Sequence, residues 1–380
     1  MDEYSIKVCN EVSTARSMGK ELGLIFAGTP QLWTEMRKFS IRTLRDFGFG
    51  KIRTNFILSV LNVLWCMIAG VRYAHDDPKL KKLLETNFTM IKVQTFINPT
   101  HSFPRLKKIF PKFLNVDYFS KVYQECHKYS QSLIDERKAE DENLQMMIED
   151  FLQTGSTTSV GTLNYGVLFR TLNPRVQERC QAEIDAVVAR HLVTTLDDIE
   201  KLVNEFLHFI KTHANSYVII YVNIDDTFFT EFFGMPYFQA TILETHRLGN
   251  IVPIPIPRVS PANWTLRGYT IPKDTLIISN HYSVHMDEEY WGDPKTFRPE
   301  RFINDKDEFI RDKRVGQFGF GKRYCIGATL TNSVIPIYIS TLLQNFNFSA
   351  LSDSKPPTME PELGVILLPK EFSVRVTPRP

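Results

Sequence analysis

The chain has 380 residues, of which 43% are hydrophobic and 23% are charged, so it can bury a large core in one or two domains. Its formal net charge is only +2 and its basic residues are scattered, which excludes nucleic acid as a partner. The five cysteines are odd in number and widely separated, which argues against a disulfide framework and for a reducing compartment.

The N-terminal part of the chain predicts helices and no targeting signal. Its first residues are polar and do not form a signal peptide. The segment 32–39 predicts a helix on which Trp33 and Arg37 lie one turn apart on the same face. The longest apolar stretch, 56–71, is interrupted by polar residues and predicts a buried helix rather than a membrane span.

A further helix is predicted from residue 144 onward. Apolar residues keep helical spacing over 144–152 and lead into Thr-Gly-Ser-Thr-Thr-Ser at 154–159. A glycine such as Gly155 inside a helix costs about 1 kcal/mol relative to alanine, so it needs a reason. That reason is a helix bend, close packing or a functional groove, and the residues alone leave these alternatives open.

The segment 173–190 has mixed charge and predicts an amphipathic helix. Further along, Glu244 and Arg247 are spaced i, i+3 and can pair on a helix, which by itself indicates an ordinary surface ion pair. The proline-rich segment 252–258 predicts extended chain, and the alternation over 269–278 predicts a hairpin pair of strands.

Two histidines, His281 and His285, lie four residues apart, as zinc ligands on a helix would. This spacing alone is weak evidence, and the chain contains no paired C-x-x-C that would support a zinc site.

One cysteine occupies a special place in the segment 318–327, which reads Phe-Gly-Phe-Gly-Lys-Arg-Tyr-Cys-Ile-Gly. Cys325 follows a glycine-rich loop and precedes a predicted helix, where the helix dipole and Arg323 favour the thiolate. A small buried hydrophobe is the plain alternative. A nucleophile would need a histidine base. A phosphate-binding loop is disfavoured, because Arg323 stands where Ser or Thr would hold magnesium.

The complete pattern F-x-x-G-x-R-x-C-x-G resembles the cytochrome P450 family, in particular its animal microsomal members of invertebrate type. The resemblance implies that Cys325 is the axial thiolate ligand of the iron of haem b and that Phe318 shields its sulfur. It also assigns the haem propionates to four side chains, Trp33, Arg37, Arg258 and Arg323.

The resemblance further implies that Thr158 serves oxygen activation in a groove of the helix. Thr157 stands where the family usually has an acid, so the proton supply must rest on Thr158, water or another donor. Glu244, Arg247 and Arg301 match the E-x-x-R and P-E-R-F elements of the family and would form a buried network that locks the haem-binding core.

The implied fold is mainly α with a small β-sheet component, in a single cytochrome P450-like domain over residues 1–380. Compared with the family pattern, the N-terminal membrane anchor and the first strands are expected to be absent. Residues 203–234 look like an insertion, which is either a gene-model or splicing artefact or a real surface insertion.

The implied activity is that of a monooxygenase which inserts one oxygen atom from O2 into a small lipophilic substrate. The substrate would be a hormone-like terpenoid or sterol such as methyl farnesoate, or a foreign compound, and the reaction a hydroxylation or an epoxidation. The NADPH-cytochrome P450 reductase would supply electrons at the cytosolic face of the endoplasmic reticulum, with the enzyme on the membrane surface. The alternative is a truncated or mis-spliced, non-catalytic chain with impaired haem binding.

Overall fold

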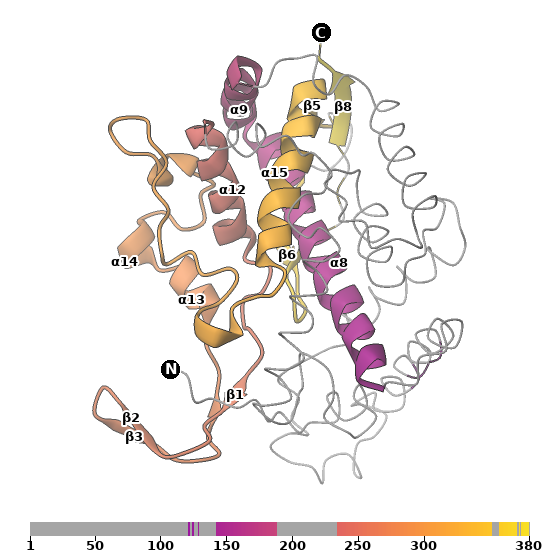
Figure 1. Cartoon of the computed structure of the whole chain (residues 1–380). Coiled ribbons are helices and arrows are strands. Elements are labelled where there is room, and N and C mark those ends of the chain that lie inside the picture. Colours follow the sequence, from indigo (N-terminus) through magenta and orange to yellow (C-terminus); the bar gives the residue numbers. More distant parts are fainter. Residues whose placement is uncertain are drawn as a thin grey trace.

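The computed structural model describes residues 142–187, 234–351, 357–370, 372 and 374–379, and the single helical positions 121, 124 and 128. The described part is mostly helical, as predicted (Figure 1). Its long helices are α8 (Glu142–Leu172), α9 (Pro174–Val187), α12 (Pro236–Gly249) and α15 (Ala328–Asn345). Trp33, Arg37 and residues 203–233 lie outside the described residues.

The helix boundaries follow local sequence signals. Helices α9 and α12 each begin with a proline, a residue that suits the first helical position because no intrahelical partner is lost there. Helix α12 ends where Asn250 adopts a left-handed conformation with φ of 43°. The helix predicted after Cys325 is present as α15, and Pro336 lies inside it.

These helices share one apolar core. Helix α8 packs against α9, α12 and α15 in the described part of the chain, and α15 crosses it in Figure 1. Helix α9 buries Val176, Cys180 and Ile184, which share one face at helical spacing, so its predicted amphipathic character is confirmed. At Gly166, an added Cβ would lie 2.6 Å from the Cδ1 atom of Ile339, so the glycine permits the close approach of α8 and α15.

The strands form small antiparallel pairs. Strand β1 (Arg258–Val259) pairs with β4 (Leu276–Ile277), and β2 (Trp264–Leu266) pairs with β3 (Tyr269–Ile271). The remaining pairs are β5 (Phe346–Ala350) with β8 (Val374–Pro378), and β6 (Pro361–Glu362) with β7 (Leu368–Pro369). The sheet component is therefore small, as predicted.

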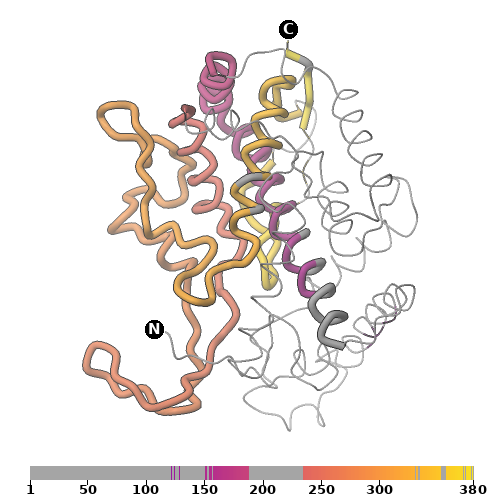
Figure 2. Tube along the Cα trace, in the orientation of Figure 1, coloured from indigo at the N-terminus to yellow at the C-terminus, as the bar shows by residue number. Residues whose placement is uncertain are grey.

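The prediction that the two strands within 269–278 pair with each other in a hairpin is wrong. Its first strand pairs backward with β2, and its second strand pairs with β1. The reason is the tight turn at Arg267 and Gly268, whose φ angles of 49° and 85° suit a two-residue hairpin. This β2–β3 hairpin projects away from the other described elements (Figure 2).

Short helical segments connect β4 to the cysteine loop. They are α13 (His281–His285), α14 (Glu288–Trp291), and the 3-10 turns η1 (Pro299–Phe302) and η2 (Gly321–Arg323). Across the described ranges, no helix combines the length and the apolar character that a membrane crossing requires.

Candidate active site

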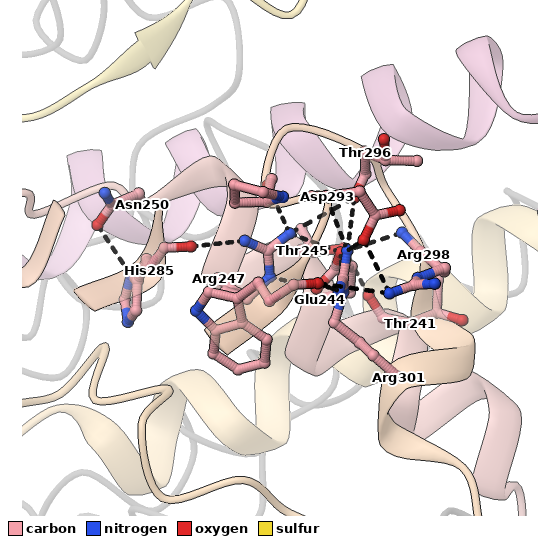
Figure 3. A network of polar contacts seen from close by, with 12 residues as sticks. Thr241, Glu244, Thr245, Arg247, Asn250, His285, Asp293, Thr296, Arg298 and Arg301 are labelled. Atoms are coloured by element: carbon pink, nitrogen blue, oxygen red, sulfur yellow. Dashed lines mark hydrogen bonds and ion pairs between the residues drawn. The ribbon is translucent and has the colours of Figure 1, made fainter. Parts of the chain in front are cut away.

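A buried ion pair joins Glu244 and Arg247, one turn apart on α12 (Figure 3). Both side chains are fully buried, and two guanidinium nitrogens donate to the two carboxylate oxygens of Glu244 at 2.7 and 2.8 Å. Such a bidentate, charge-assisted pair fixes both side chains in one geometry. The plain interpretation of this pair as a surface contact is therefore wrong.

Three further groups complete this network. Arg301 donates its Nε–H to Glu244 at 3.1 Å and also contacts Asp293 at 3.1 Å, while the backbone N–H of Arg298 donates to Glu244 at 3.0 Å. Arg247 in turn donates to the backbone carbonyl of His285 at 2.6 Å. The predicted buried network of Glu244, Arg247 and Arg301 is confirmed, and it ties α12 to the segment that leads into the cysteine loop.

The cysteine loop has a glycine-dependent backbone. Gly319 and Gly321 have φ angles of 74° and 70°, which residues with a side chain rarely adopt. The N–H of Cys325 donates to the carbonyl of Phe318 at 2.9 Å, which closes the loop just before α15. Cys325 is exposed in the described structure, so the interpretation as a buried hydrophobe is wrong.

Aromatic side chains of the loop contact histidines from other elements. The ring centroids of Phe318 and His246 are 5.6 Å apart, and those of Phe320 and His281 are 6.4 Å apart. Burial, and next the positive charge of Arg258 on β1, lower the pKa of His281. Arg258 therefore acts electrostatically on the same histidine whose ring contacts Phe320 of the cysteine loop.

The histidines behind the loop were not predicted as a group. Burial, and to a smaller extent Arg311, lower the pKa of His246 to about 4. Burial, and next His281, lower the pKa of His285 to about 4, and its Nδ1 pairs with the side-chain oxygen of Asn250 at 3.0 Å. Both imidazoles are therefore neutral at pH 7.

Zinc is not supported by these histidines. Within the described ranges, no group of three or more His, Cys, Asp or Glu side chains is arranged to hold a metal ion. The spacing of His281 and His285 instead places one ring against the cysteine loop and the other in the core.

Thr158 lies on α8, which packs against α15, the helix after Cys325. Its hydroxyl donates to the backbone carbonyl of Thr154 at 2.5 Å, and its side chain is half-buried. The neighbouring Thr157 is only 3% exposed. Of the two threonines, Thr158 is the more exposed residue.

The residues of the loop fit a haem group. The Phe320 and Tyr324 side chains are 60% and 37% exposed beside the exposed Cys325. Large apolar side chains around a thiol, with Arg323 in the same loop and Arg258 nearby, match a flat apolar ring that carries carboxylates. A bound haem would supply the oxygen chemistry, and the protein its ligand and orientation.

Comparison with known proteins identifies the family. The cytochrome P450 family model matches residues 50–204 and 229–376. Cytochrome P450 2U1 from Homo sapiens is 28% identical and aligns with 95% of this chain and 71% of its own length. Farnesoate epoxidase from Bombyx mori is 26% identical and aligns with 96% of this chain and 78% of its own length. Cytochrome P450 2L1 from Panulirus argus is also 26% identical and aligns with 100% of this chain and 81% of its own length.

A solved structure shows the same fold. A zebrafish cytochrome P450 determined with progesterone matches 99% of this chain and 89% of its own, with a TM-score of 0.75 and 20% identity. The family model covers well over half of the chain, and the cysteine loop fits the cofactor of that family. The chain therefore belongs to the cytochrome P450 family, whose members are monooxygenases that bind haem b through a cysteine thiolate.

Proposed function

We propose that Cys325 is the axial ligand of the haem iron and that the enzyme inserts one oxygen atom from O2 into a lipophilic substrate. The observation that carries the proposal is the exposed position of Cys325, in a loop that contains two glycines with positive φ. The N–H of Cys325 donates a hydrogen bond to the carbonyl of Phe318, which preorganises the loop.

The other site residues have supporting roles in this proposal. Phe318 shields the sulfur from water, and Arg258 and Arg323 bind the haem carboxylates as permanent cations. Trp33 and Arg37, which lie outside the described residues, would bind the same carboxylates. Thr158 holds or passes protons where O2 is activated, because its hydroxyl can both donate and accept.

The substrate class is proposed from one relative. Farnesoate epoxidase of Bombyx mori aligns with almost the whole chain, so we propose a small terpenoid ester such as methyl farnesoate and epoxidation as the reaction. Hydroxylation of a sterol-like or foreign lipophile is the second possibility within the same chemistry.

We also propose the usual setting of microsomal members of the family. The NADPH-cytochrome P450 reductase supplies electrons from the cytosolic side, and the enzyme lies at the endoplasmic reticulum membrane, from which lipophilic substrates are drawn. The proposal treats residues 1–380 as one domain, in which residues 203–234 are an insertion.

The test is the difference spectrum of the full chain reduced under carbon monoxide, followed by turnover with reductase and methyl farnesoate. We expect the red-shifted Soret band of thiolate-bound ferrous haem in the unchanged chain, and its loss in Cys325→Ala. Cys180→Ala is the matched control, because Cys180 is fully buried between α9 and α12 and should leave the band in place. A band that persists in Cys325→Ala would overturn the ligand assignment.

Absence of the band in the unchanged chain would favour the second candidate, a non-catalytic protein with impaired haem binding. The replacement of the usual acid by Thr157 is the feature of the chain that favours this alternative. Product formation with reductase would exclude it.

A further inference from the structure

The β2–β3 hairpin has one face made of large apolar side chains. They belong to two cross-strand pairs, Trp264 with Ile271 and Leu266 with Tyr269. Cross-strand partners share a face of the ribbon, and so do residues two apart in one strand, so all four side chains lie on the same side. The opposite side carries the remaining pair, the threonines at 265 and 270.

The apolar face becomes more exposed toward the tip of the hairpin. At the base, Trp264 and Ile271 are half-buried. At the tip, Leu266 is 52% exposed and Tyr269 is 76% exposed. The hairpin projects away from the other described elements (Figure 2). Apolar side chains gathered on one face of a projecting element, rather than scattered singly, indicate an interaction site.

We infer that this face of the β2–β3 hairpin docks onto the head-group region of a lipid bilayer that contains anionic lipids. The inference rests on the proposed membrane setting of the enzyme, and it names the surface of the chain that makes the contact.

The charge of the hairpin favours an anionic lipid surface. The segment 260–273 contains two exposed basic residues, Arg267 at the tip and Lys273 at the base, and no acidic residue; the next acid in the sequence is Asp274. A basic side chain next to an anionic bilayer raises the affinity by about fivefold. The rings of Trp264 and Tyr269 are apolar with one polar group each, which suits the level of the lipid head groups.

The backbone of the hairpin limits the depth of the contact. The β2–β3 sheet has two strands, so its outer edges have N–H and C=O groups that need water or polar head groups as partners. The face can therefore enter only the boundary between head groups and acyl chains, to a depth of about 5–10 Å. The side-chain oxygen of Asn263 accepts the backbone N–H of Lys273 at 2.7 Å, which holds the base of the hairpin together.

The size of the apolar face argues against a protein partner of fixed shape. A stable protein interface uses about 20–30 residues on each side. On this face, Leu266 and Tyr269 are the two side chains that are more than half exposed. A bilayer offers no fixed shape to match, so a small apolar tip beside positive charge is enough for it.

The first experiment measures binding of the full chain to phosphatidylcholine vesicles, with and without phosphatidylserine, by co-sedimentation. The double variant Leu266→Thr with Tyr269→Thr keeps residues that favour strands and should bind about tenfold more weakly to both kinds of vesicle. The double variant Arg267→Gln with Lys273→Gln should bind about 20-fold more weakly, but only to vesicles with phosphatidylserine. Unchanged binding of the first variant, or an equal loss of the second on both vesicles, would overturn the inference.

Ile310→Thr is the matched control. Ile310 has the same exposed fraction as Leu266, 52%, but lies in another segment of the chain. We expect its binding to both kinds of vesicle to equal that of the unchanged chain. A loss as large as that of the hairpin variant would show that binding follows total surface hydrophobicity, and would overturn the inference.

The second experiment reports the orientation of the hairpin on the bilayer. Positions 269 and 270 are adjacent and lie on opposite faces of β3. Tyr269→Trp and Thr270→Trp therefore place a fluorescent side chain on the apolar and the polar face in turn. With brominated lipids in the vesicles, the signal above that of the four native tryptophans should be quenched at 269 and not at 270. Equal quenching at both positions, or none at 269, would overturn the inference.

The outcomes separate this inference from the proposed function. Tight vesicle binding that does not depend on the hairpin would overturn the inference and leave the membrane setting in place. No vesicle binding by the unchanged chain would overturn both. Self-association that is lost in the Leu266→Thr, Tyr269→Thr variant would assign the face to a second copy of the chain instead. The carbon monoxide spectrum should be the same in every variant, and its absence in the unchanged chain would count only against the haem proposal.

Discussion

Replacement of Glu244 by Gln should destabilise the fold more than any other single loss of charge in the described network. Glu244 accepts four hydrogen bonds, two from Arg247 and one each from Arg301 and the backbone of Arg298, at distances of 2.7–3.1 Å. Its loss leaves the fully buried guanidinium of Arg247 without a counter-charge, while Arg301 keeps Asp293. Removal of one member of a buried pair costs about 3–5 kcal/mol, and we expect about 4 kcal/mol here.

Urea unfolding followed by circular dichroism measures this loss. With an m-value of about 3 kcal/mol/M, a loss of 4 kcal/mol lowers the midpoint by roughly 1.3 M. The control is Glu360→Gln, which removes an exposed ion pair with Lys370 of similar length, 2.7 Å, and should cost about 0.5 kcal/mol or less. Equal shifts in the two variants would refute the reasoning that burial sets the strength of the network.

Two more outcomes follow from the packing around the site. Because the folded pKa values of His246 and His285 are about 4, against 6.5 unfolded, the unfolded chain binds more protons as pH falls below about 6.5. The free energy of unfolding should therefore fall by about 2 kcal/mol for each histidine between pH 7 and pH 5. His246→Gln should make the free energy of unfolding less dependent on pH in this range. An unchanged pH dependence would contradict the lowered pKa of His246. Gly166→Ala should lower the free energy of unfolding by about 1–3 kcal/mol, because the added methyl group overpacks against Ile339. Adding Ile339→Val should restore part of this loss, as measured by thermal unfolding. An unchanged stability of Gly166→Ala would show that the core can rearrange around the added methyl group.

Several features could be predicted from the sequence because their causes are local. Glycines at 319 and 321 occupy a loop that needs positive φ, and prolines start α9 and α12. The amphipathic face of α9 follows from the spacing of its own residues. The family pattern around Cys325 is equally local, since all its positions lie within ten residues.

Other features depended on which segments pack together. The spacing of Glu244 and Arg247 allowed an ion pair on one helix. That ion pair is buried only because the segment around Asp293 and Arg301 packs against it. The strand 269–271 could pair in either direction, and the turn at Gly268 selected β2. In the same way, His246 looked ordinary within its helix until packing placed its ring against Phe318.

The family, the helical class and the thiolate candidate could all be predicted from residue order, because they depend on backbone preferences and short spacings. Which polar groups are shielded from water depends instead on the packing of segments that are distant in sequence. Asp150 shows the difference, since nothing in its neighbours in sequence distinguishes an exposed carboxylate from one that is 4% exposed. Burial is set by contacts between distant segments, and it is burial that changes the strength of an ion pair and the protonation of a side chain.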